Sequence, residues 1–295
     1  MTASDDAKPE EKAAKPQSAN ANLAVRIATA AVGAPAILLI LYRAPHWGGF
    51  LLIFLATLIG AWELFGMTHQ EDPPSRMIGV GLTGGVSAVF YWCSGYPKHY
   101  IALMIIVPLL GPLVTLLRLG DMKTAALRAC AMSMGPMFVG LPLTLLAVMN
   151  RDIGLQTGVA SDGPGFVILS IMFAWFGDTD GYFAGRFLGK HKLYPAVSPK
   201  KTVEGALGGL AGSALGAVMA HFWYLPSLPL GTGIGLALLA GALGQLGDLG
   251  ESLLKRSTGV KDSGAIVPGH GGILDRVDAL IMTSTVVYLY TLFRA

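Results

Sequence analysis

The chain has 295 residues, of which 53% are hydrophobic and only 13% are charged. Charged residues are about half as common as in soluble proteins, so a soluble globule would have too little polar material to cover its surface. A disordered chain and a disulfide scaffold are excluded as well, because apolar residues dominate and only two cysteines are present. A formal net charge of +3 is too small to indicate a nucleic-acid partner. What remains is an integral membrane protein.

The apolar residues fall into long runs that follow a polar start. Residues 1–25 are rich in Ala, Lys, Glu and Asp, and we expect a disordered tail there. The runs that follow are about 20 residues long, which is enough to cross a bilayer as a helix. We place them at 26–42, 49–69, 77–96, 99–118, 124–149, 165–187, 203–226, 231–251 and 273–293. The sequence therefore predicts an all-α, polytopic membrane protein with about nine transmembrane helices.

Lys and Arg residues predict the orientation of these helices. If the helices alternate in direction, the tail and the loops at 70–76, 118–123, 188–202 and 252–272 share one side, which holds most of the basic residues. The other side has only Arg43, Lys98, Arg151 and Arg294. The positive-inside rule places the basic side in the cytoplasm, so we expect a multi-pass protein of the cell (inner) membrane with its C-terminus outside.

The two halves of the chain differ in chemistry. We divide it into the tail, an N-terminal transmembrane region at 26–150 with about five helices, and a C-terminal region at 151–295 with about four. In the N-terminal region Glu63 is the only acid within an apolar run, and we interpret it as a hydrogen-bonded structural carboxylate near a helix end. The C-terminal region holds many acids in or beside apolar runs: Asp178, Asp180, Glu204, Asp248, Glu251, Asp275 and Asp278. Because a charge at the centre of a membrane helix costs about 2.5–3.5 kcal/mol, such acids indicate a functional site.

Three polar segments carry these charges. In WFGDTDGYFAGRFLGKHKL (175–193), small residues that suit close helix packing flank Asp178. In SPKKTVEG (198–205), Ser198 and Pro199 suit a helix start that Ser198 or Thr202 could cap. Lys200 and Lys201 would then lie near a helix N-terminus, where anions are favoured. The glycines at 205–217 and 231–250 are expected to be packing contacts between helices.

The third segment runs from 247 to 280 and is the most informative. Asp248, Glu251 and Ser252 share one helical face, and Asp275 and Asp278 share a face of the next helix. The glycine-rich loop between them can bring backbone N–H groups close to phosphate oxygens. Two carboxylate-bearing helices joined by a basic, glycine-rich loop could hold Mg²⁺ against a polyphosphate.

The string SLLKRSTGVKDSGAIVPGHGGILDRVD (252–278) resembles the signature of phosphatidate cytidylyltransferases, also called CDP-diacylglycerol synthases. Its fixed positions are Ser252, Lys255, Arg256, Lys261, Asp262, His270, Asp275, Arg276 and Asp278. The GDxxES, GDT…GRFLGKHKL and SPKKTVEG stretches are similar to this family too, and the resemblance is strongest over 170–295. Asp180 and Gly181 depart from the family, which more often has small residues there, so Asp180 is given no catalytic role.

The resemblance implies transfer of CMP from CTP to phosphatidic acid, which gives CDP-diacylglycerol and pyrophosphate for phospholipid synthesis. The C-terminal region would then be catalytic, with the active site open to the cytoplasm for CTP and to membrane lipid for the acyl chains. The expected catalytic residues are Asp248, Asp275, Lys261 and His270. Expected substrate-binding residues are Lys200, Lys201, Ser252, Lys255, Arg256 and Arg276. Mg²⁺, with room for a second metal ion, would be held by Asp248 and Asp275, with Asp278 and Asp178 as weaker ligands.

Two other classes of protein stay open at this point. A CTP-dependent kinase or a cytidylyltransferase acting on a polyprenol or another lipid would have a related acidic, glycine-rich pattern. An ion-coupled transporter also carries intramembrane acids, but transporters usually show matching features in two halves, whereas this chain concentrates its charges in one. A homodimer is compatible with the small-residue faces and has no further support in the sequence.

Overall fold

The computed structural model describes residues 19–264, 266 and 271–294. Its helices in the first half are α1 (Ala19–Arg43), α2 (His46–Thr68), α3 (Pro73–Trp92), α4 (Pro97–Leu117), α5 (Met122–Gly135), a π-helical turn η1 (Pro136–Gly140) and α6 (Leu141–Thr157). The second half has α7 (Asp162–Leu188), strands β1 (Lys192–Tyr194) and β2 (Ser198–Thr202), α8 (Val203–Met219), a π-helical turn η2 (Ala220–Tyr224), α9 (Leu230–Ser257) and α10 (Leu274–Phe293). Each predicted apolar run corresponds to one continuous helix, which confirms the helical membrane fold.

Five of the described helices are long and apolar enough to cross a membrane by length and composition. They are His46–Thr68, Pro97–Leu117, Met122–Thr157, Val203–Tyr224 and Leu230–Ser257. The expected number of about nine spans stays a prediction. At the N-terminus, α1 begins at Ala19, inside the expected tail, because Ala and Leu residues in 19–25 are good helix formers.

One long helix joins the two regions of the chain. Helices α5 and α6 are continuous through η1, and the expected boundary at residue 150 lies inside α6. Proline interrupts the backbone pairing of the neighbouring α4, where Pro112 has no N–H to give the carbonyl of Pro108. Ser133 of α5 donates to that carbonyl at 2.7 Å, so a hydroxyl from the next helix replaces the missing donor.

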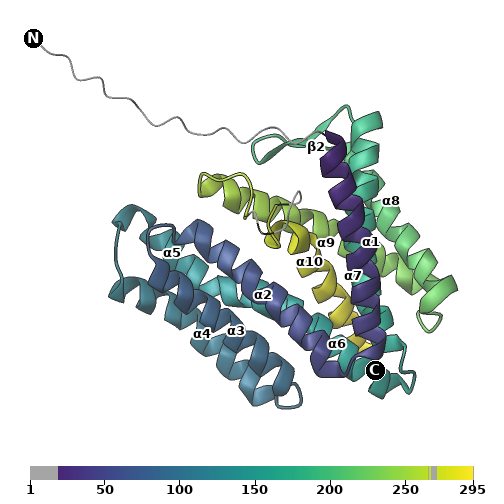
Figure 1. The fold of residues 1–295 in the computed structure, drawn as a ribbon, viewed down its shortest axis with the longest axis horizontal. Coiled ribbons are helices and arrows are strands. Elements are labelled where there is room, and N and C mark those ends of the chain that lie inside the picture. Colours follow the sequence, from purple (N-terminus) through teal and green to yellow (C-terminus); the bar gives the residue numbers. More distant parts are fainter. Residues whose placement is uncertain (1–18, 265, 267–270, 295) are drawn as a thin grey trace, which may run out of the picture.

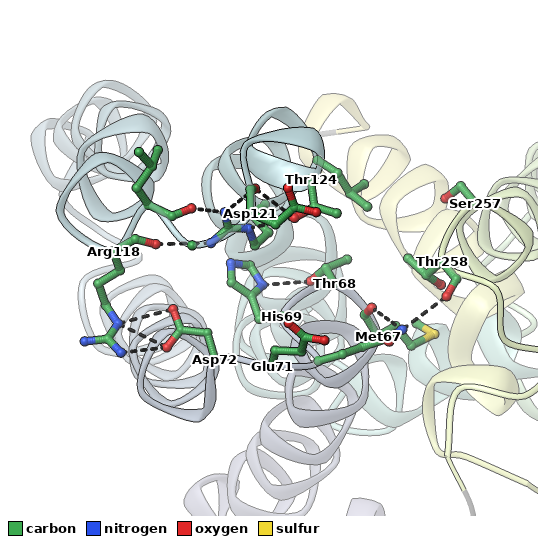
Figure 2. Close-up of a pocket in the computed structure, with 15 residues that line it drawn as sticks. Met67, Thr68, His69, Glu71, Asp72, Arg118, Asp121, Thr124, Ser257 and Thr258 are labelled. Carbon is green, nitrogen blue, oxygen red and sulfur yellow. Dashed lines mark hydrogen bonds and ion pairs between the residues drawn. The ribbon is translucent and has the colours of Figure 1, made fainter.

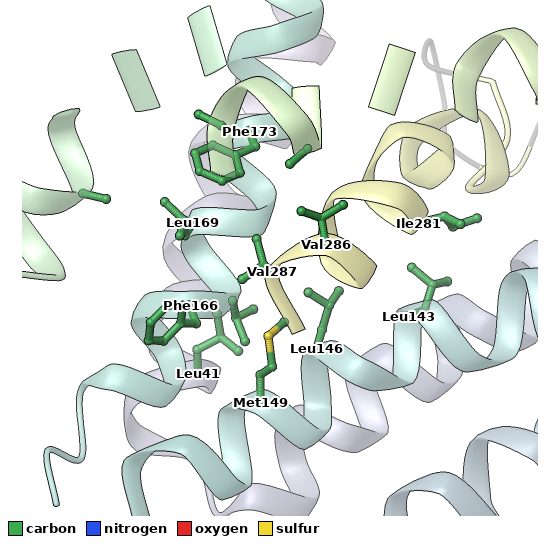
Figure 3. Packing of buried hydrophobic residues seen from close by; sticks show 14 of the residues in the cluster. Leu41, Leu143, Leu146, Met149, Phe166, Leu169, Phe173, Ile281, Val286 and Val287 are labelled. Carbon is green, nitrogen blue, oxygen red and sulfur yellow. The ribbon is translucent and has the colours of Figure 1, made fainter. Parts of the chain in front are cut away.

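Helix α10 lies between the two groups of helices that Figure 1 separates, and it contacts α2 and α6 on one side and α7 and α9 on the other. Figure 3 shows the buried core where α6, α7 and α10 meet, with Leu146, Phe173 and Val287 among its members. Hydroxyl groups also bridge these helices: Thr283 donates to the carbonyl of Ser170 at 2.9 Å. Such a core gives α10 a fixed position from which its first turn can present acidic residues.

Helices α7 and α8 pack through glycines. A Cβ added at Gly209 would lie 2.7 Å from the carbonyl oxygen of Gly177, and one at Gly181 would lie 3.2 Å from that of Gly205. Since no side chain separates the two backbones, the helices approach as closely as small residues allow. The interpretation of the 205–217 glycines as packing contacts is therefore confirmed for Gly209.

The segment before α8 differs from the prediction. Ser198–Thr202 is strand β2, paired antiparallel with β1, and the helix begins only at Val203. Ser198 therefore does not cap a helix, whereas Thr202 does, because its hydroxyl accepts from the backbone N–H of Gly205 at 3.1 Å. Pairing with β1 extends the backbone and outweighs the helix-start preference of Ser-Pro. Lys200 and Lys201 are thus placed by a hairpin just ahead of the helix N-terminus.

Candidate active site

A pocket of about 370 Å³ lies where α7, the β-hairpin, α8 and α9 meet. Four predicted site residues line it: Asp178, Lys200, Lys201 and Asp248. Much of the remaining wall is glycine backbone from the α7–α8 contact, including Gly177, Gly181, Gly185 and Gly205. The fold therefore brings together residues that are up to 70 positions apart in a space with little side-chain bulk.

The best-defined contact in this pocket is an ion pair. Lys201 on β2 donates to Asp248 on α9 at 2.5 Å, and each side chain is 26% exposed. Ser252, one turn further along α9, donates to the other oxygen of Asp248 at 3.5 Å. The predicted shared face of Asp248 and Ser252 is thus present, and it points toward the hairpin lysines.

Three acids from three helices repel one another at this site. Asp178 of α7 and Asp278 of α10 each have an electrostatic interaction with Asp248 of α9, and Asp278 also interacts with Asp178. Lys201 and Arg276 partly offset the charge on Asp178. In the described part of the chain, no three His, Cys, Asp or Glu side chains are grouped closely enough to hold a metal ion.

A second polar cluster lies at the junction of α9 and α10. Lys255 is 12% exposed and donates to Glu251 at 2.9 Å and to Asp275 at 2.6 Å. Asp275 also accepts from the backbone N–H groups of Gly272 (2.9 Å) and Ser263 (3.1 Å). Lys255 therefore lies inside the protein as a bridge between helices, and the carboxylate of Asp275 is already well supplied with donors.

The other predicted residues lie at the surface near these clusters or outside the described residues. Arg256 is exposed and donates to the carbonyl of Val260 at 3.3 Å. Lys200, Lys261 and Arg276 are exposed as well. His270 is not among the described residues. The roles assigned to all of these residues stay predictions.

Sequence reasoning missed several residues that line the pocket. Tyr182 and Arg186 follow Asp178 by one and two turns of α7, and the Tyr182 hydroxyl pairs with Arg186 at 2.6 Å. Gln245 precedes Asp248 by three residues and donates to the carbonyl of Ala206 at 3.0 Å. Spacings of three, four and eight residues place side chains on one helical face, and this signal could have found all three.

Glu63 also approaches the signature segment. It is 3% exposed, and it accepts from the backbone N–H groups of Ile273 (3.0 Å) and Leu274 (2.8 Å) and from the hydroxyl of Ser263 (3.1 Å). The interpretation of Glu63 as a hydrogen-bonded carboxylate is confirmed. Its partners belong to the other half of the chain, which the sequence did not indicate.

A larger cavity of about 610 Å³ lies between the α2–α3 and α4–α5 loops and the end of α9, as Figure 2 shows. The two arginines of this cavity both have polar partners. Arg118 pairs with Asp72 at 2.8 Å, and its hydrogen bonds lower the pKa of Asp72 to about 2. Buried Arg128 donates to the carbonyls of Arg118, Leu119 and Asp121 and to the hydroxyl of Thr124. None of the predicted site residues lines this cavity.

Comparison with known proteins agrees with the motifs. The profile of the Cytidylyltransferase family matches residues 24–293. A phosphatidate cytidylyltransferase of Staphylococcus aureus (strain COL) is 33% identical over 266 residues, which cover 87% of this chain and 94% of that protein. Those of Staphylococcus haemolyticus and Synechocystis are 41% and 48% identical over 146 and 125 residues, or 56% and 42% of their lengths. The chain therefore belongs to the cytidylyltransferase family, as its signature segment predicts.

Proposed function

We propose that this protein transfers CMP from CTP to phosphatidic acid, which yields CDP-diacylglycerol and pyrophosphate. The observation that carries the proposal is the pocket in which Asp178 and Asp248 meet Lys200 and Lys201 among apolar helices. The name of the relatives and the complete signature string at 252–278 support the same substrate pair. A nucleotide and a lipid must both reach such a pocket, which lies at the end of helices that suit a membrane.

The chemistry needs no nucleophile from the protein. A phosphate oxygen of phosphatidic acid attacks the α-phosphorus of CTP, and the bond from that phosphorus to the oxygen bridging to the β-phosphate breaks. Pyrophosphate leaves with both electrons of that bond. Catalysis then consists of holding two anions together and neutralising their charge. We assign this task to the cations around the pocket and the signature segment: Lys200, Lys201, Lys255, Arg256, Lys261, His270 and Arg276, with Ser252 beside Asp248.

The acids around the pocket offer the ligand type that a divalent cation prefers, although among the described residues they would have to move closer together to hold one. Asp178, Asp248 and Asp278 supply only oxygen ligands, and their mutual repulsion would be relieved by a positive ion. We propose that these residues hold Mg²⁺, with Asp275 joining if it exchanges Lys255 for the ion. When bound, the ion would neutralise charge on the CTP phosphates, and a second ion is compatible with the number of acids. The chain's own contribution is to fix Asp248 through Lys201 and Ser252.

We further propose that this face lies in the cytoplasm and that the membrane is the cell (inner) membrane. The loops on the expected basic side do meet: Gln70 donates to the carbonyl of Thr258 at 3.1 Å, and the cavity of Figure 2 joins the 118–123 loop to them. A single cysteine at position 262, in a cysteine-free background, tests the orientation in intact cells. It should resist an impermeant thiol reagent from outside, and labelling from outside would overturn this topology.

Position-specific labelling of CTP tests the reaction. With purified protein, Mg²⁺ and phosphatidic acid, a label on the α-phosphate should enter the lipid product, whereas a label on the γ-phosphate should appear in pyrophosphate. A lipid kinase would give the opposite pattern, and a polyprenol cytidylyltransferase would require a different lipid in the panel. Failure to label any lipid would overturn the proposed function. A homodimer stays a prediction.

A further inference from the structure

A carboxylate from the other half of the chain holds two parts of the signature segment together: Ser263 and the pair Ile273 and Leu274. We call these three residues the neck. Glu63 of α2 accepts from the hydroxyl of Ser263 on one side of the neck and from the backbone N–H groups of Ile273 and Leu274 on the other. Ser263 and Leu274 are 11 positions apart in the sequence. Because one carboxylate contacts both, it fixes the distance between the end of the Lys261 stretch and the start of α10.

Glycines make this contact possible. A Cβ at Gly264 would lie 2.5 Å from one oxygen of Glu63, and a Cβ at Gly272 would lie 2.5 Å from the other. Any other residue at either position would press on the carboxylate or displace it. The glycine-rich character of the segment, read in the sequence as a phosphate-binding feature, thus also serves to admit the side chain of Glu63.

The carboxylate completes a helix that has no cap of its own. Residue Ile273 at the N-cap of α10 offers no side-chain hydrogen bond, so the first N–H groups of the helix need an outside acceptor. Glu63 supplies both of its oxygens there, and a negative charge at a helix N-terminus is favoured by the helix dipole. The N–H groups of the helix terminus therefore offset part of the charge on Glu63.

Asp275 holds the same neck from the opposite side. It binds the backbone N–H groups of Ser263 and Gly272 and the ammonium group of Lys255. Glu63 and Asp275 together tie Ser263 to the first turn of α10, and Asp278 follows in the next turn. A shift of this neck would change the position of Asp275 relative to Lys255. It would also change the position of Asp278 relative to the acids of α7 and α9.

We propose that Glu63 is a positioning residue for the transfer reaction. It holds Ser263 next to Ile273 and Leu274, so that Lys255, Asp275 and Asp278 keep the arrangement that the reaction requires. This role rests on the proposed function, and it assigns a part in the reaction to the otherwise plain N-terminal half. Both oxygens of the Glu63 side chain accept hydrogen bonds, whereas an amide at this position would offer one acceptor and one donor.

The test compares Glu63→Gln with Glu71→Gln, an exposed acid eight residues further on. Glutamine keeps the size of the side chain but turns one acceptor into a donor that faces N–H groups. We expect Glu63→Gln to lower kcat by at least tenfold and to leave the KM for phosphatidic acid within about twofold. Activity is measured well below both thermal midpoints and normalised to folded protein. Glu71→Gln should match the wild type.

Hydrogen exchange at the amides of Ile273 and Leu274 gives a second readout that does not depend on activity. Glu63→Gln should accelerate exchange there and leave the centre of α10 unchanged. Wild-type kcat in the variant, unchanged exchange at the neck, or an activity loss that disappears after normalisation to folded protein would each overturn the positioning role. If the wild-type protein itself transfers no CMP, the proposed function fails. The contact of Glu63 with the neck is then tested by hydrogen exchange and by the rise in thermal midpoint that CTP with Mg²⁺ produces in each protein.

Discussion

The two cavities of this protein differ in how their charges are balanced. In the larger cavity, between the loops of the N-terminal half and the end of α9, Arg118 is paired with Asp72 and Arg128 is enclosed by carbonyl and hydroxyl oxygens. In the smaller pocket, Asp178 and Asp248 lie within electrostatic range of each other and of Asp278 on α10, and Lys201 is paired only with Asp248. Size therefore does not identify the site. Like charges at close range identify the site better, because a fold keeps them together only where a bound ligand or the reaction offsets their repulsion.

The same contrast appears in how the halves pack. In the N-terminal half, side chains fill the space between helices, as the stacked rings of Phe50 on α2 and Tyr91 on α3 illustrate. Around the smaller pocket, α7 and α8 meet through Gly177, Gly205 and Gly209, so backbone forms the wall. Where the wall is glycine backbone, it leaves room for a nucleotide or a lipid head group beside the charged residues.

The sharpest test of this comparison neutralises Asp248 in the smaller pocket, Asp275 at the neighbouring α9–α10 junction and Asp72 in the larger cavity. Asp248→Asn and Asp275→Asn should each reduce CTP-dependent lipid formation at least a hundredfold, which is about 2.7 kcal/mol of transition-state stabilisation. Asparagine keeps the shape and removes the charge that attracts Mg²⁺. Asp72→Asn, in the larger cavity, should stay within about threefold of wild type, since asparagine can still cap α3 and only the partly exposed ion pair with Arg118 is lost.

Initial rates across a Mg²⁺ titration, with thermal unfolding in detergent, check this prediction. Either site variant retaining more than about a tenth of the wild-type rate at saturating Mg²⁺ would show that its carboxylate is not an essential ligand. An inactive variant that is also unfolded would make the residue structural. A large loss in Asp72→Asn would remove the distinction between the two cavities.

The second prediction concerns an exposed lysine of the signature segment. Lys261→Ala should raise the KM for CTP and lower kcat, with a combined loss of roughly ten- to a hundredfold in kcat/KM, because hydrogen bonds to charged groups contribute about 1.5–3 kcal/mol. Lys123→Ala, at the exposed start of α5, is the matched control and should have wild-type kinetics. If CTP titration gives the same constants for both variants, Lys261 is only an anchor at the membrane surface.

Sequence reasoning reached the helices more readily than the contacts between them. Each apolar run became a helix because bilayer length and hydrophobicity are local properties of the chain. The hairpin at Ser198–Thr202 was missed, since its strand exists only through pairing with β1. Motif spacing brought Asp248 and Ser252 to one face, but the partners of Glu63 lie about 200 residues away and leave no periodic signal. Lys255, expected to bind substrate, is only 12% exposed because α10 brings Asp275 to it, and no sequence pattern indicated that contact.

The glycine wall can be tested by adding the side chain that it excludes. Gly209→Val would place a Cβ 2.7 Å from the carbonyl oxygen of Gly177, so α7 and α8 would have to separate. Overpacking of this kind costs about 1–3 kcal/mol, and we expect the thermal midpoint and the transfer rate to fall together. The control is Gly81→Val in α3, where an added Cβ meets nothing within 4 Å. Equal midpoints for the two variants would mean that the close contact between α7 and α8 does not contribute to stability.

The smallest effect is expected in the larger cavity, where His69 directly follows α2 and is 3% exposed. Burial lowers the pKa of His69 to about 4, with Arg128 adding to the shift and Asp72 opposing it. Between pH 6.5 and 4 the unfolded chain therefore takes up a proton that the folded protein refuses, so stability falls as the pH falls through this window. From pH 7 to 5.5 the free energy of unfolding falls by about 1 kcal/mol, or roughly 2–4 °C in thermal midpoint.

His69→Gln should reduce that drop in thermal midpoint. His46→Gln, at an exposed position at the opposite end of α2, is the control for an exposed histidine. Because none of the proposed catalytic groups lines this cavity, kcat at pH 7 should be the same in both variants, and a large loss in His69→Gln would show that the two cavities are coupled.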